Sequence, residues 1–529
     1  MTYWDLVFIF IFLPLTVIIY NLLPQKHRWK ALLIASYIFF WSISGKLIIY
    51  LLITTLSMFL YGKYFAKMQN KRDEMLKNAE KEKKKEIKAQ YLKKERKVLV
   101  LAIIVQIGIL VVLKYSSFLG TNINTVFNIL NIPFSFKIAK FLVPIGISFY
   151  TLQAIAYMVD VYKEKIKPDE YLGRLALFIS FFPQIMEGPI SRYTQTAQSL
   201  WEGNKTNYES LKFGVQRIIW GLMKRIVIAD RLNLFILAIF DNYTKFDGGI
   251  IFIGMVLYTL QLYADFSGTI DMAIGIGEIF GVKLPENFKQ PFFSKTISDF
   301  WTRWHITLGT WLRDYIYYPV SLSSKCKKIT TSARKKIGNY YGPLIASAVA
   351  LFAVWICNGL WHGSDWNYIF FGMYHFAIIL SGKIIEPFNK KVISILHINR
   401  EKFIYSVLQM IRTAFLVFIG ELFFRANSLK AGFEMFGIMI SNFTFKSLLD
   451  GQIFQLGIGR GDFLILAIMV VILFVVGILK ENGVDIRKSV SKKNIIIRWT
   501  IYYAVLILII VFGAYGVGYK PVDPMYAQF

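Results

Sequence analysis

The residues best suited to chemistry in this sequence are two histidines that each follow a tryptophan. His305 lies in FWTRWHITLGTWLRDYIYYP, from Phe300 to Pro319, and His362 lies in NGLWHGSDWN, from Asn358 to Asn367. An imidazole titrates near neutral pH and can take up or release a proton in a reaction. Ionisable groups beside apolar, membrane-depth sequence are costly and are usually kept for a task. We therefore take His305 and His362 as a candidate pair.

Helical spacing predicts how the first of these stretches is built. A helix through Phe300 to Pro319 would carry two stripes, one formed by Trp301, His305, Leu308 and Leu312 and the other by Arg303, Thr307, Thr310 and Asp314. This pattern is typical of a helix at the boundary between water and lipid. The alternative is that its tryptophans and arginines only anchor the helix and that His305 is a packing residue.

The other three histidines are weaker candidates. His375 lies on an apolar face in WNYIFFGMYHF, which favours packing, and His27 and His397 belong to basic loops. Two cysteines, Cys326 and Cys357, provide no framework for disulfides, and we expect no metal site.

Several motifs in this order resemble the membrane-bound O-acyltransferase (MBOAT) family, and in particular its bacterial alginate O-acetyltransferase branch. They are EGPISR at 187–192, DFSGTIDMAIGIGEIFG at 265–281, the Trp-His pair in FWTRWHITLGTWLRDY, and LWHG at 360–363. The teichoic acid D-alanyl transfer proteins are a sister group. Thr302 stands where the family has a second arginine before the Trp-His pair, a mild departure.

The resemblance implies that His362 is the catalytic histidine and general base, and that His305 is the family's second histidine. His305 would orient the acyl donor, relay the proton or line the passage. Acyl transfer also needs donors for the oxyanion, and an Asn amide or an indole N–H can serve. Asn358 lies one helical turn before His362 and could hold a carbonyl or the imidazole tautomer, or else make a hydrogen bond between helices.

Five further residues accompany the pair as supporting candidates. Four are neighbours in the motifs, namely Trp361, Trp304, Arg303 and Asp314. The fifth is Glu187, in a stretch broken by Pro183, Gly188 and Pro189. Such a stretch predicts a broken or re-entrant helix, in which Glu187 is either a structural cap or a carboxylate of a tunnel.

Composition defines the elements that must position these side chains. Of 529 residues, 55% are hydrophobic and 17% aromatic, with a mean hydropathy of +0.48, which predicts an all-α, polytopic membrane protein. The net charge of +28 lies mostly in loops beside apolar runs, where cations anchor cytoplasmic ends, so we expect no nucleic-acid partner. We expect about a dozen transmembrane, re-entrant and interfacial helices in one domain, residues 1–529, with a catalytic core region at 172–381.

The positive-inside rule predicts the topology of the chain in the cell membrane. The first apolar segment, 5–23, is expected to be retained, and both termini are expected outside. Residues 70–97 are strongly charged and predict a cytoplasmic helical excursion. The basic segment 325–336 is also cytoplasmic, so the apolar run that begins at Gly342 should carry His362 toward the outer half. His305 should approach the same passage from the inner side.

Other chemistries lack their usual markers. Neither a G-x-S-x-G elbow nor a Walker A motif occurs, and the His-x4-Asp pattern fails because Thr310 and Asn367 stand at the aspartate positions. A transporter would show paired broken helices in two similar halves, and we see no such repeat. A transporter or an export-complex scaffold remains the alternative outside enzyme chemistry.

The resemblance implies a fold around a central passage and a specific reaction. An acyl group, expected to be acetyl, would move from a cytosolic donor such as acetyl-CoA or another acyl thioester, with no tightly bound cofactor. It would pass toward an exported polysaccharide or an extracytoplasmic SGNH-type transferase. The alternative is D-alanyl transfer from a carrier-protein thioester to teichoic acid, disfavoured by the extra C-terminal spans at 463–479 and 495–515. Membrane lipids and an acyl carrier protein are further expected partners.

Overall fold

The computed structural model describes residues 1–138, 141–516 and 518–523, and it confirms the all-helical prediction. Among these residues no β-strand forms, and one isolated β-bridge joins Phe288 to Trp304. Eight helical stretches of the described chain are long and apolar enough to cross a membrane. The protein is therefore a multi-pass membrane protein, as its hydropathy predicts.

Two compact units make up the fold. Among the described residues, the first contains 1–215 and 272–285, and the second contains 216–271 and 286–523. Two helices, α10 (Tyr208–Leu222) and α12 (Gly248–Ile279), contribute residues to both units. The sequence predicts one domain over residues 1–529. Whether the two units form one domain depends on how they pack together, so this stays a prediction.

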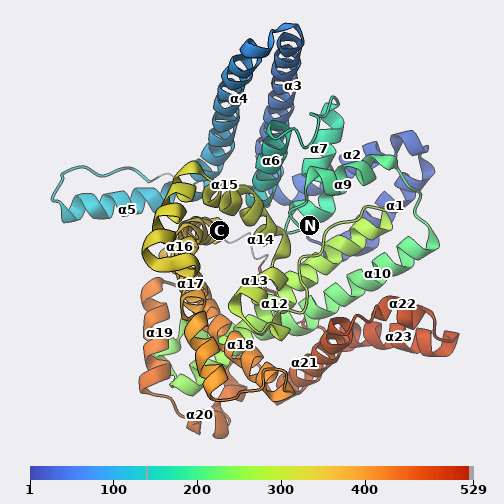
Figure 1. The fold of residues 1–529 in the computed structure, drawn as a ribbon. Coiled ribbons are helices and arrows are strands. Elements are labelled where there is room, and N and C mark those ends of the chain that lie inside the picture. Colours follow the sequence, from blue (N-terminus) through green and yellow to red (C-terminus); the bar gives the residue numbers. More distant parts are fainter. Residues whose placement is uncertain (139–140, 517, 524–529) are drawn as a thin grey trace. The chain divides into compact units, whose positions relative to one another are not determined.

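Most connections between the helices of the first unit are short, but residues 130–146 form a long connection from α5 to α6 (Figure 1). The π-helix η1 (Phe8–Phe12) leads directly into α1, and Pro24 precedes α2. The helices are α1 (Leu13–Leu22), α2 (Gln25–Ser44), α3 (Ile48–Asn78), α4 (Lys81–Leu110), α5 (Ser116–Ile129), α6 (Ile147–Tyr162), α7 (Leu172–Ser180), α8 (Phe182–Ile185) and α9 (Tyr193–Glu202).

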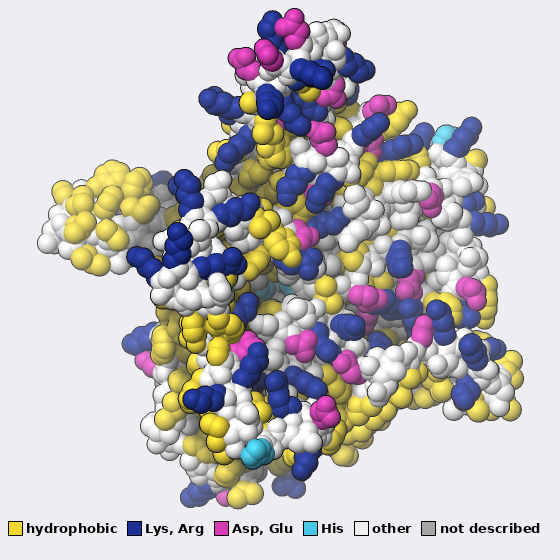
Figure 2. Space-filling view, in the orientation of Figure 1, with side chains coloured by type: hydrophobic (Ala, Val, Ile, Leu, Met, Phe, Trp, Pro, Cys, Tyr) yellow, Lys and Arg dark blue, Asp and Glu magenta, His cyan; other side chains and the backbone are white. Residues whose placement is uncertain are grey.

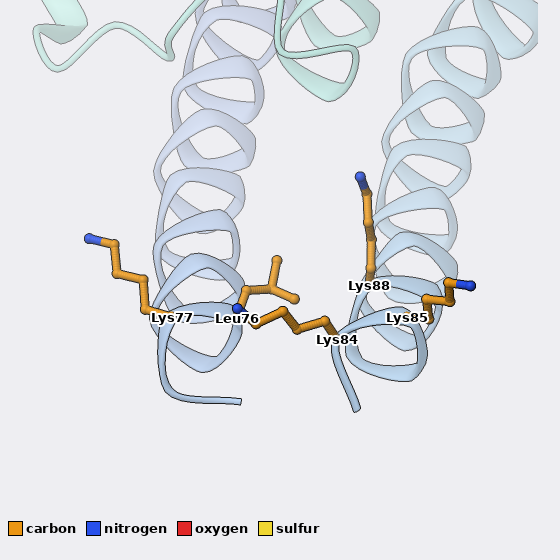
Figure 3. Close-up of a pocket in the computed structure, with 5 residues that line it drawn as sticks. All are labelled: Leu76, Lys77, Lys84, Lys85 and Lys88. Carbon is orange, nitrogen blue, oxygen red and sulfur yellow. The ribbon is translucent and has the colours of Figure 1, made fainter. Parts of the chain in front are cut away.

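Residues 70–97 form the end of a helical hairpin made by α3 and α4, which lie side by side (Figure 1). Arg72 on α3 joins Glu95 on α4 at 3.1 Å, which ties the two helices together below the turn. Lysines gather near the tip (Figure 2), and Leu76, Lys77, Lys84, Lys85 and Lys88 line an open depression there (Figure 3). The cytoplasmic location of this hairpin stays a prediction.

The segment from Leu172 to Arg192 is broken, as its prolines and glycine predict. Helix α7 ends at Ser180, Phe181 leaves the helical conformation, and α8 is a single turn. A Cβ on Gly188 would lie 2.2 Å from Cα of Gln184, so only glycine fits this close approach. Glu187 is fully buried within the first unit.

The second unit contains the remaining helices. Three π-helical or helical segments follow one another from residue 223: η4 (Met223–Ala229), α11 (Asp230–Asp241) and then α12. After a long irregular segment come α13 (Ile297–Arg303), α14 (Ile306–Leu312), η7 (Arg313–Tyr317), α15 (Tyr318–Ser321), α16 (Ser324–His362), α17 (Trp366–Ile395), α18 (Phe403–Arg425), α19 (Leu429–Ser441), α20 (Lys446–Leu449), α21 (Arg460–Glu481), α22 (Ile486–Ser491) and α23 (Ile495–Phe512).

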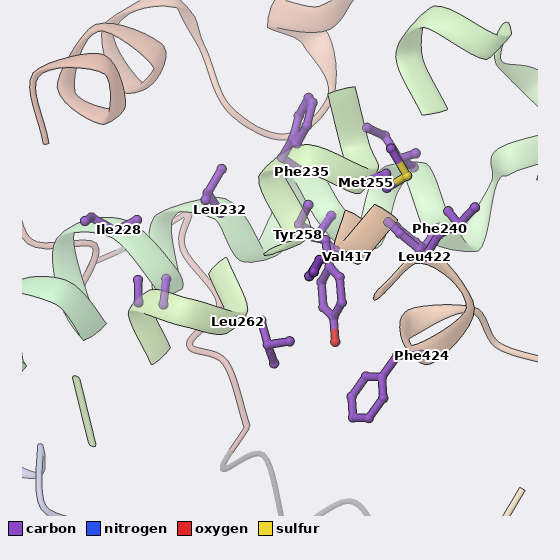
Figure 4. Packing of buried hydrophobic residues seen from close by; sticks show 14 of the residues in the cluster. Ile228, Leu232, Phe235, Phe240, Met255, Tyr258, Leu262, Val417, Leu422 and Phe424 are labelled. Atoms are coloured by element: carbon purple, nitrogen blue, oxygen red, sulfur yellow. The ribbon is translucent and has the colours of Figure 1, made fainter. Parts of the chain in front are cut away.

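Apolar side chains from several of these helices form one buried cluster. Leu232 and Phe235 from α11, Met255 from α12, and Val417 and Leu422 from α18 meet in it (Figure 4). This core fixes α11, α12 and α18 within the second unit.

Two glycines let α16 and α17 approach closely. A Cβ on Gly359 would lie 2.5 Å from the carbonyl oxygen of Tyr368, and one on Gly372 would lie 2.3 Å from that of Trp355. Small residues at such positions allow two helix backbones to come into contact. Helix α17 continues past the basic residues after Leu380, through Pro387 to Ile395.

The chain beyond α23 folds back onto the start of the second unit. Ala514 N donates to the carbonyl of Ile226 at 3.1 Å, and Arg231 donates to the carbonyl of Phe512 at 2.5 Å. The Tyr519 hydroxyl, 3.1 Å from Arg231 Nη1, donates to Asp462 at 2.9 Å. These bonds attach the tail to η4 and α11.

Candidate active site

The helix expected from Phe300 to Pro319 is interrupted at His305. Helix α13 ends at Arg303, Trp304 is extended, and His305 adopts the left-handed conformation with φ 47° and ψ 51° before α14 begins. The predicted apolar and polar stripes are therefore wrong, because they need one continuous helix. For a residue other than glycine this conformation costs about 1–2 kcal/mol, so its surroundings must hold it in place.

The segment before α13 supplies what holds the break. Residues 287–289 run antiparallel to residues 303–306. Lys289 N donates to the carbonyl of Arg303 at 2.9 Å, and Ile306 N donates to that of Asn287 at 3.0 Å. Two backbone groups at the break thus bond to this segment instead of to a helical neighbour.

His305 is almost completely buried among aromatic rings. Its imidazole meets the ring of Phe266 edge to face at 4.8 Å and the indole of Trp361 at 5.4 Å. Burial lowers the pKa of His305 well below its ordinary value, and repulsion from His362 lowers it further. The ring is therefore neutral at pH 7.

His362 ends α16 and contacts the same indole. Its ring lies 4.9 Å from that of Trp361, and Phe424 and Phe371 pack around it at 5.1 and 5.9 Å. Only 7% of His362 is exposed. Both histidines therefore contact the same tryptophan, Trp361.

Asn358 lies on α16 one turn before His362, as the sequence predicts. It is buried, and within the described chain its Oδ1 accepts no hydrogen bond. The carbonyl oxygen of its amide is therefore open to a donor that the described residues do not supply.

The supporting candidates are placed in different surroundings. Trp304 packs against Phe288 at 5.1 Å and Phe300 at 5.4 Å. The Arg303 guanidinium joins Asp299 and Glu481, and Asp314 joins Arg313 at 3.0 Å. Glu187 is completely buried in the first unit, just after α8.

His375 packs in the core of the second unit. Its Nδ1 accepts a hydrogen bond from the Trp301 indole at 3.3 Å, and its ring stacks on Trp355 at 5.2 Å. The ring is completely buried. This arrangement fits the packing role predicted for it.

Sequence reasoning missed Asn287. Its Oδ1 lies 3.2 Å from His305 Nδ1 and also accepts from Thr307 N at 3.0 Å and Thr307 Oγ1 at 2.9 Å. In the sequence it is one asparagine in the loop KLPENFKQPFFSK, where no periodicity marks it. The nearness of this loop to the Trp-His pair was the available signal.

A small polar cavity of about 60 Å³ adjoins the same loop. Its walls include Glu286 and Phe288, the two neighbours of Asn287, together with Lys224 and Asp271. Lys224 Nζ lies 2.6 Å from the Asp271 carboxylate. This volume suits a few water molecules. In the described chain no group of three or more His, Cys, Asp or Glu side chains could hold a metal ion.

Comparison with known proteins identifies the family of this chain. The model of the MBOAT, membrane-bound O-acyltransferase family, matches residues 172–333. A probable alginate O-acetylase AlgI of Pseudomonas syringae pv. tomato is 33% identical over 439 residues, which cover 82% of this chain and 74% of that protein. The chain belongs to the membrane-bound O-acyltransferase family, and it is an O-acyltransferase.

Two other relatives act on different polymers. A peptidoglycan O-acetyltransferase of Helicobacter pylori is 31% identical over 368 residues, covering 65% of this chain and 64% of its own. A teichoic acid D-alanyltransferase of Bacillus subtilis is 32% identical over 253 residues, covering 47% of this chain and 60% of its own.

Proposed function

We propose that this enzyme moves an acetyl group from a cytosolic thioester, of the acetyl-CoA class, toward an exported polysaccharide. The observation that carries the proposal is the pair of buried histidines that both contact Trp361, in a multi-pass O-acyltransferase. A relative that covers 82% of this chain is named as an alginate O-acetylase.

In this proposal His362 is the general base. It takes the proton of an acceptor hydroxyl, whose oxygen attacks the thioester carbonyl carbon and forms a tetrahedral oxyanion. We assign to the Nδ2 group of the buried Asn358, one helical turn before His362, the role of donating to that oxyanion. Collapse breaks the C–S bond, and the leaving thiolate receives the proton, so an ester and a free thiol are the products.

The acceptor is proposed to lie outside the cell. Helix α16 begins with a lysine-rich turn, which the positive-inside rule places in the cytoplasm. It is kinked at Gly338 (φ 82°, ψ 175°), and the part after the kink ends at His362. The acetyl group would then reach a polysaccharide or an extracytoplasmic SGNH-type transferase. Membrane lipids surround the exposed apolar helices.

A second candidate is D-alanyl transfer from a carrier-protein thioester to teichoic acid. Two observations favour it: the similarity to a D-alanyltransferase over 47% of this chain, and the lysines at the tip of α3 and α4, which could attract an acidic carrier protein. The similarity to the D-alanyltransferase covers 47% of this chain, against 82% for the alginate O-acetylase, so D-alanyl transfer is the second candidate.

Reconstituted protein tests the proposal. Liposomes supplied with labelled acetyl-CoA inside and an acceptor polysaccharide outside should form labelled ester, and His362→Ala should lower the rate by about 10²–10⁴-fold, the usual contribution of a general base.

The matched control is His397→Asn, because His397 is exposed at φ 49°, a conformation that asparagine tolerates. It should transfer at the wild-type rate. If His362→Ala transfers acetyl groups at the wild-type rate, His362 is not the general base. Transfer only from a D-alanyl carrier thioester would favour the second candidate.

A further inference from the structure

Asn287 is completely buried and uses only one end of its amide. Its Oδ1 receives three contacts, from His305 Nδ1, Thr307 N and Thr307 Oγ1. Its Nδ2 has no hydrogen-bond partner within the described chain. A buried donor left without a partner costs about 1–3 kcal/mol. A side chain kept at this cost indicates a task other than stability.

The backbone amide of Thr307 determines which way the Asn287 amide points. A peptide N–H can only donate, so the atom 3.0 Å from it must be the carbonyl oxygen and not the NH₂ group. That same oxygen lies 3.2 Å from His305 Nδ1. Two acceptors would repel each other there, so Nδ1 carries the hydrogen.

A neutral imidazole protonated on Nδ1 has its lone pair on Nε2. In His305 this second nitrogen is buried and has no hydrogen-bond partner among the described residues. The ring is also held at a strained backbone position by the segment that contains Asn287. The orientation of the His305 ring and its tautomer therefore both depend on residues 287–289.

We infer that Asn287 is a positioning residue that holds His305 as the Nδ1–H tautomer, so that Nε2 is the ring atom able to accept a proton during acyl transfer. The inference rests on the proposed function, because a proton acceptor matters only in a reaction that moves a proton. It assigns no bond-making step to Asn287, which acts through His305. The titratable group that acts on His305 is His362 of α16.

Three variants separate tautomer control from simple packing. Asn287→Leu keeps the approximate volume but removes the acceptor, whereas Asn287→Asp keeps an acceptor oxygen. Gln261→Met is the matched control, because Gln261 is also a buried amide, whose Nε2 donates to the carbonyl of Ala229 at 3.2 Å.

The first readout needs no substrate. Nitrogen NMR of ¹⁵N-histidine protein in lipid nanodiscs, with the His305 signal identified by its loss in His305→Gln, should show one tautomer with Nε2 unprotonated. Asn287→Leu should show both tautomers. Asn287→Asp should keep the wild-type tautomer and titrate at higher pH, because a carboxylate favours the imidazolium.

The second readout is kinetic. Asn287→Leu should lower kcat for acetyl transfer about 10–100-fold with KM within about twofold, the usual effect of losing such an orienting partner. Asn287→Asp should restore part of kcat and move the acidic limb of the pH profile upward. Gln261→Met should change neither kcat nor the profile.

Wild-type kcat and tautomer in Asn287→Leu would overturn the inference, and so would an Asn287→Asp variant no better than Asn287→Leu. If the leucine variant does not fold, an unchanged His305 titration in Asn287→Asp overturns it. A wild-type protein without transferase activity would instead refute the proposed function, while the NMR result would still decide the tautomer.

Discussion

At the scale of single residues, His305 combines burial, a left-handed backbone and a fixed partner. Burial raises the free energy of its charged form and therefore lowers its pKa. In the unfolded chain the same side chain titrates near its ordinary value of about 6.5. As the pH falls, His305 therefore takes up a proton at a higher pH in the unfolded chain than in the folded protein.

This difference predicts how stability depends on pH. Below about pH 6.5 the unfolded chain binds a proton at His305 and the native protein does not, so His305 contributes a loss of stability that grows as the pH falls. Above that pH the contribution vanishes. Thermal unfolding in nanodiscs between pH 8 and pH 5.5 should show a steeper loss for wild type than for His305→Gln. If Tm falls equally with pH in wild type and in His305→Gln, burial does not lower the pKa of His305.

At the scale of elements, the contact between α16 and α17 depends on glycine. Gly359→Ala would place a methyl group 2.5 Å from the Tyr368 carbonyl oxygen, so the helices must separate. Overpacking of this kind costs about 1–3 kcal/mol. We expect a lower Tm in the same nanodiscs.

Gly382→Ala is the control in α17, because nothing lies within 4 Å of the new methyl group. In a helix this change should stabilise by about 0.5–1 kcal/mol. If both variants melt alike, the close approach of α16 and α17 is not a stabilising feature.

The elements also show what the sequence could predict. Apolar runs and proline breaks located the helices and the interruption before Glu187, because both signals are local. The break at His305 was missed because its cause, Asn287, is 18 residues away and acts through side-chain and backbone bonds. The pairing of two histidines was predicted, but Trp361 as their shared contact was not.

At the scale of the whole molecule, charge predicts orientation in the membrane. Lysines at the tip of α3 and α4 should lie in the cytoplasm, and α5 should lie outside. In a protein with Cys326→Ala and Cys357→Ala, an impermeant maleimide should label Lys85→Cys only in inverted vesicles. Thr125→Cys, exposed on α5, should react in intact cells. The opposite pattern would reverse the topology and with it the proposed side of each substrate.

The folded-back tail has a consequence for synthesis. The carbonyl of Phe512 that Arg231 binds is 281 residues further along the chain, and the Ala514 amide that bonds to Ile226 follows two residues later. A ribosome therefore delivers these two partners of η4 and α11 long after the helices themselves. A nascent polypeptide that terminates before α23 would lack both bonds, and the Arg231 guanidinium would keep, of its partners among the described residues, only the Val227 carbonyl and the Asp462 carboxylate.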